Sequence, residues 1–118
     1  SLSNPASQIM LVDHSNTKLM MIQHVVCIQF KDSAKPEQIQ RIEKEFIGLS
    51  AKIKGIRKIE WGRNNSTEEL NKDFTHCFIV TFENEQARQE YLPHPQHKAF
   101  VATLKPILED VFVIDFTP

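Results

Sequence analysis

The residues best suited to chemistry are three histidines and the only tyrosine of the chain. His24 and His76 each lie in a segment where apolar residues occupy alternate positions, whereas Tyr91 and His97 flank a proline-bounded turn at residues 93–95. An imidazole with a pKa of about 6.5 can accept a proton near neutrality, and a phenol can donate a hydrogen bond to an oxygen that gains charge. These residue types therefore suit general acid–base chemistry, in which a positioned base typically contributes about 10²–10⁴-fold.

Two alternating segments, residues 22–30 and 74–82, are predicted to be strands, and the period of two fixes which residues share a face. His24 and His76 both fall on the bulkier face, which is expected to lie beneath helices. The same face is expected to carry three aromatic or aliphatic residues of a last strand at 111–116, namely Phe112, Ile114 and Phe116.

The helices that must cover this face are also visible in the sequence. Apolar residues at spacings of three and four predict an amphipathic helix from Pro36 to Ile53, ended by Gly55. Further elements are expected as a strand at 56–61, a loop at 63–73, a short helix capped by Asn84 and a helix at 96–104. The order βαββα(α)β predicts an α+β, ferredoxin-like domain whose four-stranded antiparallel sheet has strand order 4-1-3-2.

Composition narrows the class of protein. The chain has 118 residues and a net charge of −1, with no basic run longer than two, which argues for one domain and against nucleic acid as a partner. No apolar run exceeds four residues, so no membrane span is expected. Residues 20–118 form the predicted domain, and residues 1–19 are expected to be an arm that is not an intact signal peptide. Cys27 and Cys77 are expected to be reduced thiols, which favours the cytoplasm.

The second face of the predicted sheet is too apolar for water and too polar for a deep core. It presents two cysteines and a mixture of aliphatic and polar residues: Gln23, Val25, Cys27, Gln29, Thr75, Cys77, Ile79 and Thr81. A second sheet packed against this face would satisfy both properties, so a homodimer joined face to face is expected.

Each candidate site residue also has a purely structural interpretation. A strand histidine can bond a backbone carbonyl and fill space, and the proline turn can be a corner where His94 caps a helix. Two histidines on adjacent strands favour a pocket with a polar floor, into which His97 would face from the stripe it shares with Phe100. His94 and His97 have a spacing that metal sites use, but no carboxylate or thiolate is placed to complete a set, so no metal or cofactor is predicted.

Several short motifs together resemble the stress-responsive A/B barrel domain family over residues 20–118. They are Met20-Met-Ile-Gln-His24, Ile59-Glu-Trp61-Gly62, Phe74-Thr-His76, Tyr91-x-x-His94-Pro95-x-His97 and Val113-Ile-Asp115-Phe116-Thr-Pro118. The resemblance implies a dimeric α+β barrel. Among its members the motifs look most like a plant type of polyketide cyclase, which implies Tyr91 and His97 as the catalytic pair and His24 and His76 as pocket residues.

Two functions are expected from this pattern and resemblance. The first is a cofactor-independent cyclase or isomerase that acts on a poly-β-keto or similar carbonyl substrate. Its apolar pocket would be lined by Val26, Ile28, Phe78 and Phe100. The alternative is a non-catalytic dimer that serves in stress response or binds a small apolar ligand.

Overall fold

The computed structural model describes residues 20–118, and the arm expected over residues 1–19 lies outside the described residues. None of the helices in the described part has both the length and the apolar character needed to cross a bilayer. The elements follow the expected order: β1 (Ile22–Phe30), α2 (Pro36–Lys52), β2 (Ile56–Arg63), β3 (His76–Phe82), α3 (Glu85–Tyr91), α4 (Pro95–Leu104), the 3₁₀ turn η2 (Lys105–Ile107) and β4 (Leu108–Phe116).

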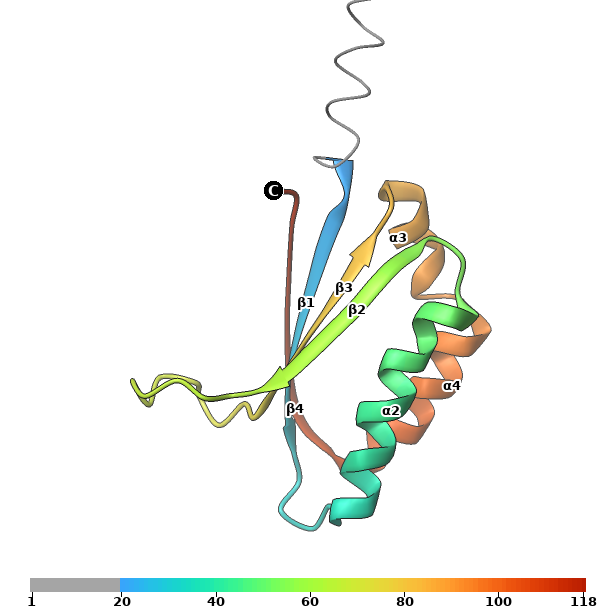
Figure 1. Cartoon of the computed structure of the whole chain (residues 1–118). Helices are drawn as coiled ribbons and strands as arrows, with labels where there is room; N and C mark the ends of the chain where they lie inside the picture. Colours follow the sequence, from blue (N-terminus) through green and yellow to red (C-terminus); the bar gives the residue numbers. More distant parts are fainter. Residues whose placement is uncertain (1–19) are drawn as a thin grey trace, which may run out of the picture.

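The four strands form one antiparallel sheet in the order β2-β3-β1-β4. The helices cover one of its faces, and the other is left open (Figure 1). This architecture confirms the predicted ferredoxin-like fold and strand order. The alternating patterns predicted the buried face of β1 and β3 correctly because both strands are central, and one face of a central strand must be buried under the helices.

α2 packs against the sheet because its apolar residues recur at helical spacing and therefore lie on one side of the helix. Pro36 opens the helix, and Ile42, Phe46 and Leu49 are buried on one side. The chain then reverses at Gly55, whose φ of 94° lies in the left-handed region that favours glycine. A Cβ at this position would come within 2.6 Å of the Ala87 Cβ, so the glycine also allows α3 to approach.

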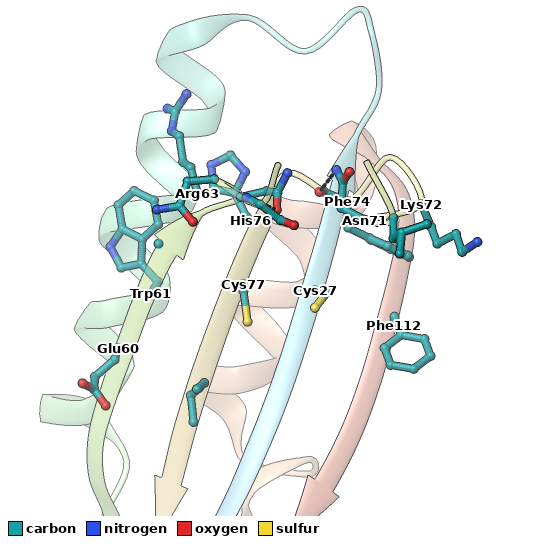
Figure 2. A pocket seen from close by; sticks show the side chains of 16 residues that line it. Cys27, Glu60, Trp61, Arg63, Asn71, Lys72, Phe74, His76, Cys77 and Phe112 are labelled. Carbon is teal, nitrogen blue, oxygen red and sulfur yellow. Dashed lines mark hydrogen bonds between the residues drawn. The ribbon is translucent and has the colours of Figure 1, made fainter. Parts of the chain in front are cut away.

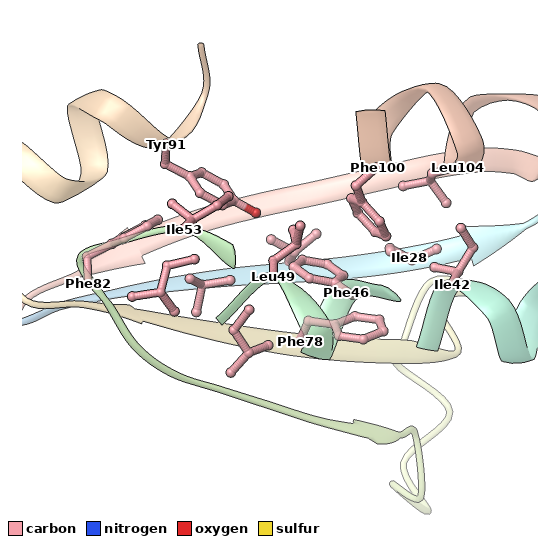
Figure 3. Close-up of a cluster of buried hydrophobic side chains, with 14 of the residues drawn as sticks. Ile28, Ile42, Phe46, Leu49, Ile53, Phe78, Phe82, Tyr91, Phe100 and Leu104 are labelled. Carbon is pink, nitrogen blue, oxygen red and sulfur yellow. The ribbon is translucent and has the colours of Figure 1, made fainter. Parts of the chain in front are cut away.

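The core between sheet and helices is aromatic and closely packed. The Phe46 ring stacks on Phe78 with ring centroids 4.3 Å apart, and Phe100 of α4 lies 4.8 Å from the same ring. Figure 3 shows these rings meeting between α2, α4 and the strands. This packing joins both long helices to the middle of the sheet.

One prediction about the last strand is wrong. β4 begins at Leu108, earlier than expected, and pairs with β1 so that Phe112 lies opposite Cys27 and Ile114 opposite Val25. Phe112, Ile114 and Phe116 therefore point away from the helices and are about half exposed, at 53%, 55% and 50%. Alternation alone does not say which of the two alternating sets of side chains in an edge strand faces the core. A shift of the pairing register by one residue exchanges the two sets.

The sheet surface opposite the helices is called the open face below. Cys27 and Cys77 lie directly opposite one another on this face, and both are free thiols, as expected. Burial and the neighbouring Cys77 raise the pKa of Cys27, so this thiol stays protonated at neutral pH. The cytoplasmic location inferred from the thiols remains a prediction.

Candidate functional site

Three of the four predicted residues converge at one end of the domain. His24 comes from β1, Tyr91 from the last turn of α3, and His97 from the first turn of α4. The ring centroids of Tyr91 and His97 are 4.2 Å apart, and those of Tyr91 and His24 are 5.8 Å apart in an edge-on arrangement. Tyr91 thus lies between two imidazoles, and these three residues are called the His-Tyr-His cluster.

Tyr91 is placed by the short helix α3. The Asn84 side chain accepts a hydrogen bond from the Ala87 amide at 2.9 Å, which caps the helix and fixes where its last residue falls. The Tyr91 ring is 2% exposed and packs edge-on against Phe82, and Figure 3 shows it reaching from α3 toward the apolar cluster. Burial raises the pKa of Tyr91 well above its usual range, so the phenol keeps its proton and can act as a hydrogen-bond donor.

His97 is held by the turn between α3 and α4. The His94 side chain caps α4 by accepting a hydrogen bond from the Gln96 amide at 3.0 Å, which is the structural role expected for it. His97 Nδ1 lies 3.2 Å from the Leu92 carbonyl oxygen, to which it can only donate, so Nε2 carries the free lone pair. Burial lowers the pKa of His97, which keeps this imidazole neutral at pH 7.

Asp115 is a component that the sequence reasoning missed. His24 Nδ1 donates a hydrogen bond to the Asp115 carboxylate at 2.7 Å, and the Arg88 guanidinium donates to the second oxygen at 3.2 Å. The pair forms because β1 and β4 place His24 directly opposite Asp115. A carboxylate bonded at Nδ1 fixes the orientation of the His24 ring and leaves Nε2 as the nitrogen available for a further contact. The only sequence signal was the presence of Asp115 in the closing motif.

His76 does not join this cluster. β3 places Val80 opposite His24, so His76 lies four residues further along the strand, toward the other end of the sheet. There its Nε2 bonds the Glu43 carboxylate at 2.8 Å, and Arg63 donates to the same carboxylate at 2.9 Å. The ring is 4% exposed and stacks on Trp61. The prediction that His24 and His76 share one face of the sheet is correct, but the prediction that they lie close together is wrong.

The apolar residues predicted to bind substrate belong to the packed core. Ile28 and Phe78 are fully buried, and Val26 and Phe100 are nearly so. The Phe46 ring packs against the rings of both Phe78 and Phe100. None of them lines a cavity described below. Their predicted contact with a substrate therefore stays a prediction.

The largest cavity described lies elsewhere, on the open face at the end where β2 and β3 are joined. Its volume is about 640 Å³ (Figure 2). A smaller hollow of about 350 Å³ on the outside of α4 is lined by His97 together with Lys98, Val101 and Lys105. Within residues 20–118, no three His, Cys, Asp or Glu side chains are grouped closely enough to hold a metal ion.

Sequence comparison relates the chain to curated plant proteins. It is 36% identical over 97 residues to the stress-response A/B barrel domain-containing protein HS1 of Arabidopsis thaliana, covering 82% of this chain and 89% of that protein. It is 27% identical over 99 residues to olivetolic acid cyclase of Cannabis sativa, covering 84% of this chain and 98% of the cyclase.

Solved structures agree with the fold. The crystal structure of At3g17210 from Arabidopsis thaliana superposes with a TM-score of 0.78 at 36% identity, covering 82% of this chain and 94% of that one. A protein of unknown function from Bacteroides fragilis, described as dimeric and ferredoxin-like, superposes with a TM-score of 0.65 at 27% identity, covering 83% and 96%. The model of the stress responsive A/B barrel domain matches residues 22–118, and the chain therefore belongs to that family.

Proposed function

We propose that the chain is a cofactor-independent cyclase or isomerase that removes a proton from carbon next to a ketone or thioester carbonyl. The observation that carries this proposal is the His-Tyr-His cluster, in which a neutral imidazole at His97 and a protonated phenol at Tyr91 have ring centroids 4.2 Å apart. The 27% identity to a protein named olivetolic acid cyclase supports the same reaction class.

The reaction needs one base and one donor. His97 Nε2 takes a proton from a carbon between two carbonyl groups, and the electron pair of that C–H bond becomes the enolate. Tyr91 donates a hydrogen bond to the enolate oxygen, where the negative charge develops. The enolate carbon then forms a bond to a second carbonyl carbon of the same substrate molecule. The proton held by His97 passes to the alkoxide that this step creates.

His24 completes the cluster as an orienting residue. Asp115 holds its Nδ1, which leaves Nε2 as the ring nitrogen that can form a hydrogen bond with the Tyr91 hydroxyl or with the substrate. Arg88 holds the second oxygen of Asp115, which fixes the carboxylate in turn. The role of His76 is different in this proposal: with Glu43 and Arg63 it stabilises the far end of the sheet.

The test is product formation from a linear poly-β-keto thioester, measured above the spontaneous rate. His97→Gln removes the base and is expected to lower kcat by about 10²–10⁴-fold. His94→Asn is the matched control, because asparagine also caps helices, and it should leave the rate within about twofold of wild type. Equal rates for His97→Gln and wild type would remove His97 from the mechanism.

A second candidate function is a non-catalytic stress-response or ligand-binding protein. It is favoured by the packing of Phe46 against Phe78 and Phe100, which fills the space where a substrate chain was expected. This alternative predicts that wild type, His97→Gln and Tyr91→Phe all give only the spontaneous rate with such thioesters.

We also propose that the chain forms a homodimer through its open face. Val25, Phe112 and Ile114 lie side by side on this face, and the two β4 residues are more than half exposed. The similar protein from Bacteroides fragilis is described as dimeric. Packing two such faces together would remove these side chains from water, which is the main driving force for association.

A further inference from the structure

Two free thiols lie in one row across the sheet on the open face. Cys77 of β3 pairs with Cys27 of β1, and both thiols are free. Gly62 of β2 lies on the far side of Cys77, and Phe112 of β4 lies on the far side of Cys27. Figure 2 shows both sulfur atoms on these neighbouring central strands. The cysteines alternate with the helix-facing residues of β1 and β3, so the reaction proposed above does not use them.

The backbone hydrogen bonds show which kind of antiparallel pair the two cysteines form. The Asn64 amide donates to the Thr75 carbonyl at 2.8 Å, so these two residues are a hydrogen-bonded pair of β2 and β3. Gly62 and Cys77, two positions along the same register, are the next such pair. The backbone groups of Cys77 therefore point toward β2 and away from Cys27. Toward β1 the two cysteines form a non-hydrogen-bonded pair, in which the Cα atoms are only about 4.5 Å apart and the side chains are closest.

This spacing fits a disulfide bond, for which the two Cα atoms lie about 4.4–6.8 Å apart. The two groups already interact, because Cys77 is one of the causes that raise the pKa of Cys27. β1 and β3 keep one continuous register on both sides of the pair, from Ile22 to Ile28. A bond between the thiols would thus join the two central strands without a change of register.

The two thiols differ in how a small molecule can reach them. Gly62 has no side chain beside Cys77, and a Cβ built at Gly62 would meet no atom within 4 Å. On the other side of the pair, the Phe112 side chain lies beside Cys27. A molecule that approaches across the open face therefore reaches Cys77 first, and Cys27 lies next to it to complete a reaction.

We propose that Cys27 and Cys77 are a modification site that closes to an intramolecular disulfide by exchange with a low-molecular-weight disulfide while the open face is uncovered. The Cys77 thiolate attacks one sulfur of the small disulfide, releases one small thiolate and becomes a mixed disulfide. The Cys27 thiolate then attacks the Cys77 sulfur and releases the second small thiolate. The two cysteine protons pass to the two released thiolates, and two electrons move from the protein to the small disulfide.

Assembly controls access to this site, and this part of the inference rests on the proposed homodimer. A partner packed on the open face covers Gly62 and the path to Cys77, so the dimer protects both thiols. The unassembled chain reacts, and the new bond then joins β1 to β3. The raised pKa of Cys27 lowers its thiolate fraction at neutral pH, so the closing step should become faster as pH increases.

Intact mass and thiol counting test the site on the full-length chain. Ile114→Lys places a charge on the open face, which keeps that face uncovered. With oxidised glutathione, this variant should lose the mass of two hydrogen atoms and both free thiols. The same variant carrying Cys27→Ser should stop at the glutathione adduct of Cys77. No reaction, two stable glutathione adducts on one chain, or a cross-link between two chains would each overturn the proposal.

Stability checks that the bond fits the native strands. The closed form should have a higher urea midpoint than the reduced form, because the bond restricts the unfolded chain. Circular dichroism checks that each variant is folded before the reaction begins. A lower urea midpoint for the closed form would mean that β1 and β3 do not accept the bond in the folded chain, and it would contradict the geometry argued above.

Two comparisons test the path and the protection. In the Ile114→Lys background, Gly62→Val should slow the first exchange step by about threefold or more because it covers Cys77, whereas Gly48→Ala on α2 should not change it. An unchanged rate with Gly62→Val would overturn the assigned path. Dimeric wild type should react more slowly than Ile114→Lys, and equal rates would overturn the protection by assembly. Sedimentation of wild type as a monomer would instead place the failure in the proposed dimer.

Discussion

At the scale of single residues, environment sets what each group of the His-Tyr-His cluster can do. His97 is neutral because burial opposes its charge, and Tyr91 keeps its proton for the same physical reason. One burial effect therefore yields a base and a hydrogen-bond donor side by side. Asp115 adds the orientation of His24 through a direct contact.

The His97 pKa gives a prediction about pH. Because the folded chain holds His97 with a pKa below the ordinary value of 6.5, an NMR titration of labelled imidazoles should place its midpoint below 6.5. The unfolded chain binds more protons in this window, so the His97 contribution to the free energy of unfolding is present above pH 6.5 and lost as pH falls through the folded pKa. The rate of the proposed cyclisation should also fall as pH is lowered, with the same midpoint as the His97 titration. A His97 midpoint above 6.5 would contradict the assignment.

Asp115 gives a second prediction at this scale. Asp115→Asn removes the charge that faces both His24 and Arg88, and it should lower the free energy of unfolding by about 1–3 kcal/mol. Asp110→Asn on the same strand is the control, because Asp110 is exposed and bonds only its neighbour's amide, and it should change stability by less than about 0.5 kcal/mol. Urea denaturation measures both. Equal effects of the two substitutions would argue against a specific role for the Asp115 carboxylate.

At the scale of elements, the connection between α2 and β2 controls how closely α3 approaches the sheet. Gly55 has a positive φ and lies against Ala87, so both its backbone and its missing side chain are required. α3 in turn carries Tyr91 at its end, so the turn at Gly55 supports the site from a distance.

A pair of glycine substitutions tests this arrangement. Gly55→Ala should destabilise the protein by about 2 kcal/mol or more, because it adds left-handed strain to a 2.6 Å contact with Ala87. Gly48→Ala in the middle of α2 meets no atom within 4 Å and should stabilise the protein by about 0.5–1 kcal/mol. Opposite signs in urea denaturation are expected, and equal signs would show that the close approach to α3 is unimportant.

At the scale of the whole molecule, the sheet has one face buried under helices and one apolar face left open. A single chain has no further element among residues 20–118 to cover that second face. Association of two copies is the simplest way to bury it, and it would also enclose the cavity at the end of the open face where β2 and β3 are joined.

The open face provides a test of assembly. Ile114→Lys places a charge in the proposed interface and should convert the dimer to monomers in analytical ultracentrifugation. Leu92→Lys is the control, since Leu92 is 63% exposed but lies outside the sheet, and it should leave the assembly unchanged. A chain that sediments as a monomer before any substitution would refute the dimer.

The elements, their order and the burial of the central strands could be predicted from local patterns of residues, because helical and strand periods are local properties. The sequence also placed Tyr91 close to His97, since only a short turn separates them. The tertiary structure alone decided the register of β4, and with it the contact between His24 and Asp115 and the exposure of Phe112. It likewise separated His76 from the cluster and paired it with Glu43 of α2. These contacts join residues far apart in the chain, and their partners depend on strand register and helix placement, which no local period specifies.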